Sequence, residues 1–69
     1  MNRQKFFKLL KMHKEEIQRI YGKTIFEDAN TFELAFYEFK RFISDSGLIR
    51  FDKSDEELFE MWINNLQMP

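Results

Sequence analysis

Large apolar residues recur at helical spacing along three stretches of this chain, which are separated by two short segments that each begin with a glycine. The first stretch runs from residue 3 to residue 21 and ends at Gly22, a residue that suits the left-handed cap after a helix. At about 100° per residue its apolar residues and one histidine form a continuous stripe. The members of the stripe are Phe6, Leu9, Leu10, His13, Ile17, Ile20 and Tyr21. The pattern predicts a single amphipathic helix over 3–21.

The second stretch predicts a central helix over 31–46 that stops at Gly47. Asn30 can cap its first turn, and Glu33 stands where a capping-box carboxylate reaches back to the cap. One face of this helix is predicted to lie in the core: Phe32, Ala35, Phe36, Phe39, Phe42 and Ile43.

The third stretch predicts a helix over 55–67. Ser54 and Glu57 have the spacing of a capping box, and acidic residues fill the first turn, where the helix dipole favours them. Its apolar face holds Leu58, Phe59, Trp62, Ile63 and Leu66. Residues 48–51, just before it, are short, apolar and partly β-branched, so we expect an extended segment over the core. A strand there would need a second copy of the chain to pair with.

These patterns together predict an all-α fold: a small three-helix bundle forming one domain over residues 1–69. A chain of 69 residues is near the lower limit for folding without a disulfide, a metal or a partner. It has no cysteine and a single histidine, which excludes disulfides and thiolate zinc sites. Stability must therefore come from a core rich in aromatic rings (the chain has nine phenylalanines) or from surface buried in a complex.

Groups that could carry out catalysis are scarce. His13 lies on the apolar stripe, where a partly buried structural histidine is more common than a catalytic base. There is no cysteine nucleophile, and the isolated Gly22 and Gly47 cannot form a phosphate-binding loop. The acidic clusters lack the alternating spacing of a calcium loop. We therefore predict that the protein is not an enzyme and holds no metal or cofactor.

The N-terminal segment does not look like a signal peptide, because Lys8 and Lys11 interrupt its apolar residues. No apolar run approaches the roughly 18–20 residues that span a bilayer, so we predict a cytoplasmic protein without a membrane partner. The excess of Phe, Lys, Ile and Asn over Gly, Ala and Pro suggests an AT-rich coding sequence. A phage or another mobile element is one source of such a chain.

Charge is distributed unevenly, although the formal net charge is only −1. Residues 1–14 carry only basic charges: Arg3, Lys5, Lys8, Lys11 and Lys14. Residues 52–69 carry five acidic residues against the single Lys53. Either the acidic third helix packs near the basic first helix, or the basic end contacts nucleic acid or an acidic protein. The pattern does not choose between these two interpretations.

Some large side chains lie outside the predicted core faces. Leu34, Tyr37 and Arg41 share the side of the second helix opposite its phenylalanines, and Phe7 projects away from the first stripe. These residue types are common at the centres of protein interfaces, although a bundle with wide core faces could bury some of them. They predict a module that binds a partner protein or a second copy of itself, such as an adaptor, inhibitor or regulator.

The alternative function is nucleic-acid binding through the first helix. Its candidate residues are Arg3, Lys8, Lys11 and Lys14, with Phe7 as a ring that could stack on a base. The acidic start of the third helix opposes it, because phosphates would repel that helix if it entered the major groove. A sequence pI near 5.8 is also low for a nucleic-acid-binding protein. Protein binding is therefore the favoured prediction.

Overall fold

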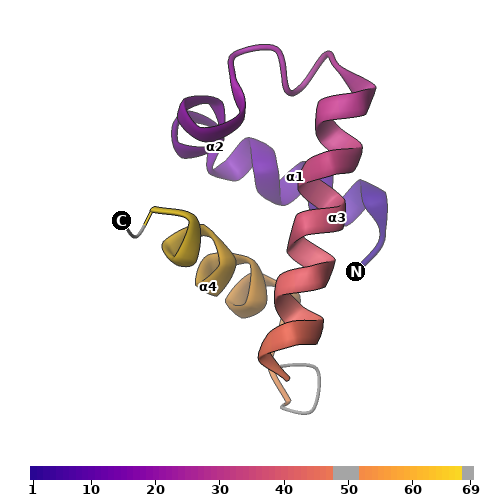
Figure 1. The fold of residues 1–69 in the computed structure, drawn as a ribbon, viewed down its shortest axis with the longest axis vertical. Coiled ribbons are helices and arrows are strands. Elements are labelled where there is room, and N and C mark those ends of the chain that lie inside the picture. The colour runs from indigo at the N-terminus through magenta and orange to yellow at the C-terminus, as the bar shows by residue number, and fades with distance from the viewer. Residues whose placement is uncertain (48–51, 68–69) are drawn as a thin grey trace.

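The computed structural model describes residues 1–47 and 52–67. This described part contains four helices, shown in Figure 1: α1 (Arg3–Met12), α2 (Lys14–Tyr21), α3 (Ala29–Ser46) and α4 (Asp55–Gln67). The prediction of an all-α fold is confirmed, but there is one helix more than the three expected. The extended segment predicted at 48–51 falls outside the described residues.

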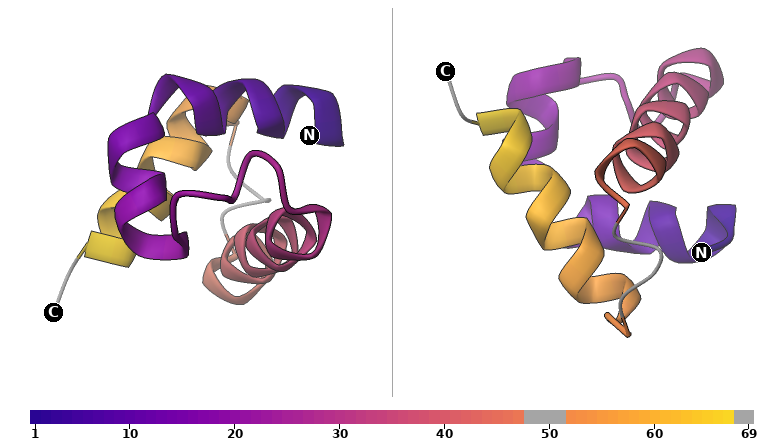
Figure 2. Two further views of the ribbon diagram at one scale, coloured as in Figure 1. Left: turned by 90° about the horizontal axis from the view of Figure 1, so that it is seen from above. Right: turned by 60° about the horizontal axis from the view of Figure 1, so that its bottom comes forward.

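The prediction of one helix over 3–21 is wrong at His13. This residue leaves the helical conformation, with φ −116° and ψ 39°, and both ends α1 and starts α2. Figures 1 and 2 show α2 turned away from the axis of α1. The bend allows both halves of the apolar stripe to pack against the rest of the protein.

Contacts on both sides of the break hold it in place. The His13 ring packs on Phe59 of α4, with ring centroids 5.3 Å apart. In α2, Ile17 is fully buried, and the Tyr21 hydroxyl donates a 2.6 Å hydrogen bond to Glu38 Oε1 on α3. The turn in the chain leaves Ile20 37% exposed, so its predicted place in the core is also wrong.

The start of α3 differs from the prediction as well. The cap is Asp28 rather than Asn30: Asp28 Oδ1 accepts hydrogen bonds from the backbone N–H of Asn30 at 3.0 Å and of Thr31 at 3.4 Å. The Thr31 hydroxyl donates to Asp28 Oδ2 at 2.9 Å. The bonds from Thr31, and then the one from Asn30, lower the pKa of Asp28. Glu33 does not reach back to the cap, because it pairs with Arg3 of α1.

The predicted end of α3 and the predicted start of α4 are confirmed. Gly47 follows α3 with φ 69°, in the left-handed conformation expected of a glycine cap. The capping box of α4 is confirmed: the Glu57 backbone N–H donates to Ser54 Oγ at 3.2 Å, and the Ser54 backbone N–H donates to Glu57 Oε1 at 3.2 Å. Hydrogen bonds from Ser54 lower the pKa of Glu57.

Figure 2 shows α1, α3 and α4 packed around one interior. Phe6 of α1 lies at the centre of the core, because its buried ring contacts rings of both α3 and α4. Its ring centroid is 4.9 Å from that of Phe36 and 5.3 Å from that of Phe39, both on α3. On α4 it is 5.6 Å from Phe59 and 5.7 Å from Trp62. The buried apolar residues are Phe6, Leu9, Leu10, Ile17, Ile25, Ala35, Phe36, Phe39, Ile43, Phe59, Trp62 and Ile63. Of these residues, all from the part of the chain that the structure describes, only Ile25, from the turn between α2 and α3, lies outside the predicted stripes.

Candidate functional site

Three residues predicted to bind a partner lie together on the side of α3 that faces away from the core. This surface, called here the α3 outer face, consists of Leu34, Tyr37 and Arg41. Leu34 is 52% exposed and Tyr37 is 55% exposed. Most large apolar side chains of the described residues are covered, so these two are among the few that offer apolar area to a partner.

Hydrogen bonds orient the polar groups of the α3 outer face. The Arg41 guanidinium donates to the Tyr37 hydroxyl oxygen at 3.3 Å and to Asp45 Oδ2 at 3.4 Å. The hydrogen bond and charge of Tyr37, followed by those of Asp45, raise the pKa of Arg41. Arg41 is therefore held beside Tyr37, and the two present a polar edge next to the apolar surface of Leu34.

Phe7, the fourth predicted residue, does not project freely into solvent. Its ring is half-buried and meets Phe26 and Phe32 edge to face, with centroids 5.7 Å and 5.8 Å away. The ammonium of Lys11 lies 5.0 Å from the centroid of the same ring. The four predicted residues are thus divided between two places, with Phe7 apart from the α3 outer face.

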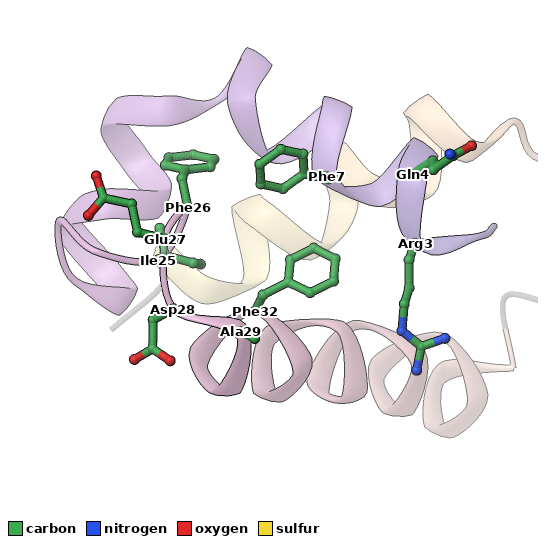
Figure 3. A pocket seen from close by; sticks show the side chains of 9 residues that line it. All are labelled: Arg3, Gln4, Phe7, Ile25, Phe26, Glu27, Asp28, Ala29 and Phe32. Carbon is green, nitrogen blue, oxygen red and sulfur yellow. The ribbon is translucent and has the colours of Figure 1, made fainter.

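Phe7 lines an open pocket of about 380 Å³ between α1 and the segment that leads into α3 (Figure 3). We call this the aromatic pocket. Its apolar wall consists of Phe7, Phe26, Phe32, Ile25 and Ala29. Its polar lining comes from Arg3, Gln4, Glu27 and Asp28. Phe26 is the sequence signal for this pocket, because its large ring belongs to none of the predicted helical stripes.

Two basic residues of α1 face acidic partners. Arg3 Nε lies 2.6 Å from Glu33 Oε1 on α3, and Lys5 Nζ lies 2.8 Å from Glu56 Oε1 on α4. Hydrogen bonding and charge within each pair raise the pKa of the base and lower that of the acid. The basic first helix and the acidic last helix are therefore in contact, as the first interpretation of the charge pattern requires.

The other basic candidates are exposed. Lys8 and Lys11 lie on α1, and Lys14 is the first residue of α2, beyond the break at His13. Arg3 is also exposed but engaged by Glu33. The four residues proposed for nucleic-acid contact therefore do not form one straight row along a single helix.

Residues 1–47 and 52–67 contain no group of three or more histidine or acidic side chains placed to hold a metal ion. None of the helices described is both long and apolar enough to cross a membrane. Comparisons of the chain with protein-family models, with curated proteins and with solved structures find no match.

Proposed function

We propose that this chain is a small non-enzymatic protein-binding module, an adaptor, inhibitor or regulator that presents the α3 outer face to a partner protein or to a second copy of itself. The observation that carries the proposal is the exposure of Leu34 and Tyr37, which are 52% and 55% exposed. The core does not need them, because the opposite side of α3 already supplies its buried residues. Tyrosine and arginine are enriched among the residues that dominate binding energy at interfaces.

The chemistry of this face fits a protein partner. Fully burying a leucine side chain contributes about 1.5–3 kcal/mol from apolar area alone. Tyr37 adds a ring and a hydroxyl that can hydrogen-bond at the edge of an interface. Arg41 lies within hydrogen-bond distance of Tyr37 and Asp45, and its remaining N–H groups can donate to acceptors on a partner.

Two further features of the proposal come from composition. The absence of cysteine fits a protein of the reducing cytoplasm. The AT-rich coding sequence that the amino-acid composition suggests fits an origin in a phage or another mobile element. Both are part of the proposal and are tested by identifying the partner.

The test is affinity capture from a lysate of the cells that encode the chain, with and without nuclease. The protein carrying both Leu34→Ala and Tyr37→Ala should lose a stoichiometric protein partner that the parent retains after nuclease treatment. Met12→Ala is the matched control, because Met12 is an apolar residue 70% exposed on α1. Equal recovery by the parent and the double variant would overturn the assignment of this face. Light scattering at increasing concentration covers the case in which the partner is a second copy.

Nucleic-acid binding remains the second candidate. It is favoured by the exposure of Lys8, Lys11 and Lys14, none of which has an ion-pair partner among the described residues. It is weakened by the engagement of Arg3 and Lys5 with acids. If it holds, binding of a labelled oligonucleotide should weaken with salt, and Lys8→Glu should abolish it. Salt-independent or absent binding would exclude this candidate.

A further inference from the structure

The aromatic pocket is a second surface that the α3 outer face does not explain. Its three phenylalanines come from separate parts of the chain: Phe7 from α1, Phe26 from the turn after α2, and Phe32 from the first turns of α3. All three rings are only half-buried, although their edge-to-face contacts hold them in place. Their uncovered surfaces gather around one hollow (Figure 3). Rings gathered around an open hollow favour an apolar group as its occupant.

The pocket has ends of different charge. Figure 3 shows Glu27 and Asp28 at the end beside Phe26, with their carboxylates directed outward, and Arg3 at the other end. Arg3 is neutralised by Glu33, 2.6 Å away. Among the described residues, neither Glu27 nor Asp28 has a lysine or arginine within ion-pair distance. The uncompensated charge that borders the pocket is therefore that of Glu27, because the Asp28 carboxylate already accepts hydrogen bonds at the start of α3.

The neighbouring cation does not cancel this end. The Lys11 ammonium lies over the Phe7 ring, 5.0 Å from its centroid, and Lys11 is not part of the pocket lining. Asp28 is kept ionised by its hydrogen bonds to the start of α3, which lower its pKa. Glu27 is exposed and free to turn toward an incoming charge.

We propose that the aromatic pocket receives one large apolar side chain of a partner protein, and that a lysine or arginine beside that side chain pairs with Glu27. The inference rests on the proposed function, since it assumes that the chain binds proteins, and it adds a second contact surface with a defined specificity. A volume of about 380 Å³ is at the small end of the range for ligand pockets, roughly 300–1,000 Å³. It is large enough for an aromatic side chain such as tryptophan or phenylalanine to enter.

A substitution at the edge of the pocket can test whether the pocket is occupied without removing any core contact. Ala29 lines the pocket and is exposed at the start of α3. Ala29→Phe adds a ring that competes for the hollow and leaves Phe7, Phe26 and Phe32 unchanged. Glu27→Lys reverses the charge at the acidic end, and Glu60→Lys makes the same change at an exposed position of α4 that is not part of the pocket.

The probe is a blocked heptapeptide with a central tryptophan between two lysines, titrated into ¹⁵N-labelled protein and followed by amide chemical shifts. We expect saturable shifts at Phe7, Phe26 and Phe32, with a dissociation constant no weaker than about 1 mM. Replacing the tryptophan of the probe with alanine should abolish the shifts. Replacing its lysines with glutamates should weaken binding by about threefold or more. The Ala29→Phe protein should not bind.

Glu27→Lys should weaken binding of the lysine peptide by about threefold or more, and Glu60→Lys should leave it unchanged. The proposal is overturned if the lysine and glutamate peptides bind equally, if both charge variants act alike, or if pocket amides do not shift. The spectra of each variant report whether it is folded. The peptide titration tests the aromatic pocket alone. The proposed function is tested separately, by partner capture with the protein that carries Leu34→Ala and Tyr37→Ala.

Discussion

Phe6 and Phe7 are adjacent in the sequence but have different roles in the structure. The Phe6 ring is fully buried and contacts α3 and α4 at once, whereas Phe7 is half-buried and lines the aromatic pocket. Residues one apart on a helix point about 100° away from each other. The first ring therefore serves the core and the second borders a surface.

The difference predicts unequal costs of truncation. Phe6→Ala should destabilise the fold by about 3–5 kcal/mol, the usual cost of removing a buried ring, which is comparable to the whole stability of a chain this small. Phe39→Ala and Trp62→Ala should have similar effects, because both side chains are buried and contact Phe6. Phe7→Ala should leave a folded protein with a smaller loss. Circular dichroism during urea unfolding measures all four, and equal losses for Phe6 and Phe7 would contradict the core assignment.

Individual helices were predictable where their signals are local. The capping box at Ser54 and Glu57 lies within four consecutive residues, so the start of α4 could be predicted correctly from the sequence. The break at His13 could not, because no proline or glycine marks it and His13 packs against a residue distant in the chain, Phe59. Asn30 and Asp28 are both good caps, and only the course of the loop into α3 decides between them.

The corrected cap gives a prediction at the scale of the element. Asp28→Ala should lower the melting temperature by about 5 °C, because it leaves two backbone N–H groups of α3 without their acceptor. Asn30→Ala should change it by no more than about 2 °C, since no hydrogen bond of the cap depends on the Asn30 side chain. If Asn30→Ala lowered the melting temperature more than Asp28→Ala, Asn30 would be the cap, as the sequence pattern predicts.

Across the whole molecule, ion pairs join helices that are distant in the sequence. Arg3 and Lys5 connect α1 to Glu33 on α3 and to Glu56 on α4. Two of the five basic residues in the N-terminal segment are therefore paired with acids inside the molecule. The α3 outer face could be predicted because helical periodicity alone identifies the side opposite the core. The aromatic pocket could not, because its walls come from three segments that only the folded chain brings together.

Stability should depend on pH at both extremes. Folding lowers the pKa of Asp28 below its ordinary 3.8 and the pKa values of Glu33, Glu56 and Glu57 below 4.5. The unfolded chain therefore binds more protons in acid, so this stabilisation is present above pH 4.5 and is lost as pH falls through the lower folded values. Burial, then the hydrogen bond to Glu38, raises the pKa of Tyr21 above 10.0, so its contribution is lost as pH rises beyond that value.

Thermal unfolding followed by circular dichroism between pH 2 and pH 11 measures this dependence. The protein carrying Glu33→Gln and Glu57→Gln should lose less stability than the parent between pH 5 and pH 2. Tyr21→Phe should lose less above pH 10. Identical pH profiles for the parent and these variants would show that other groups control the dependence.

We propose that the α3 outer face is the surface to which a partner protein binds. Its most direct test is a photoreactive phenylalanine analogue placed at position 37 and, in a separate protein, at position 12, followed by irradiation in the cells that encode the chain. We predict a discrete protein adduct, either with another protein or with a second copy, from position 37 and a weaker one or none from position 12. Adducts of equal yield from both positions, or none from position 37, would contradict the claim.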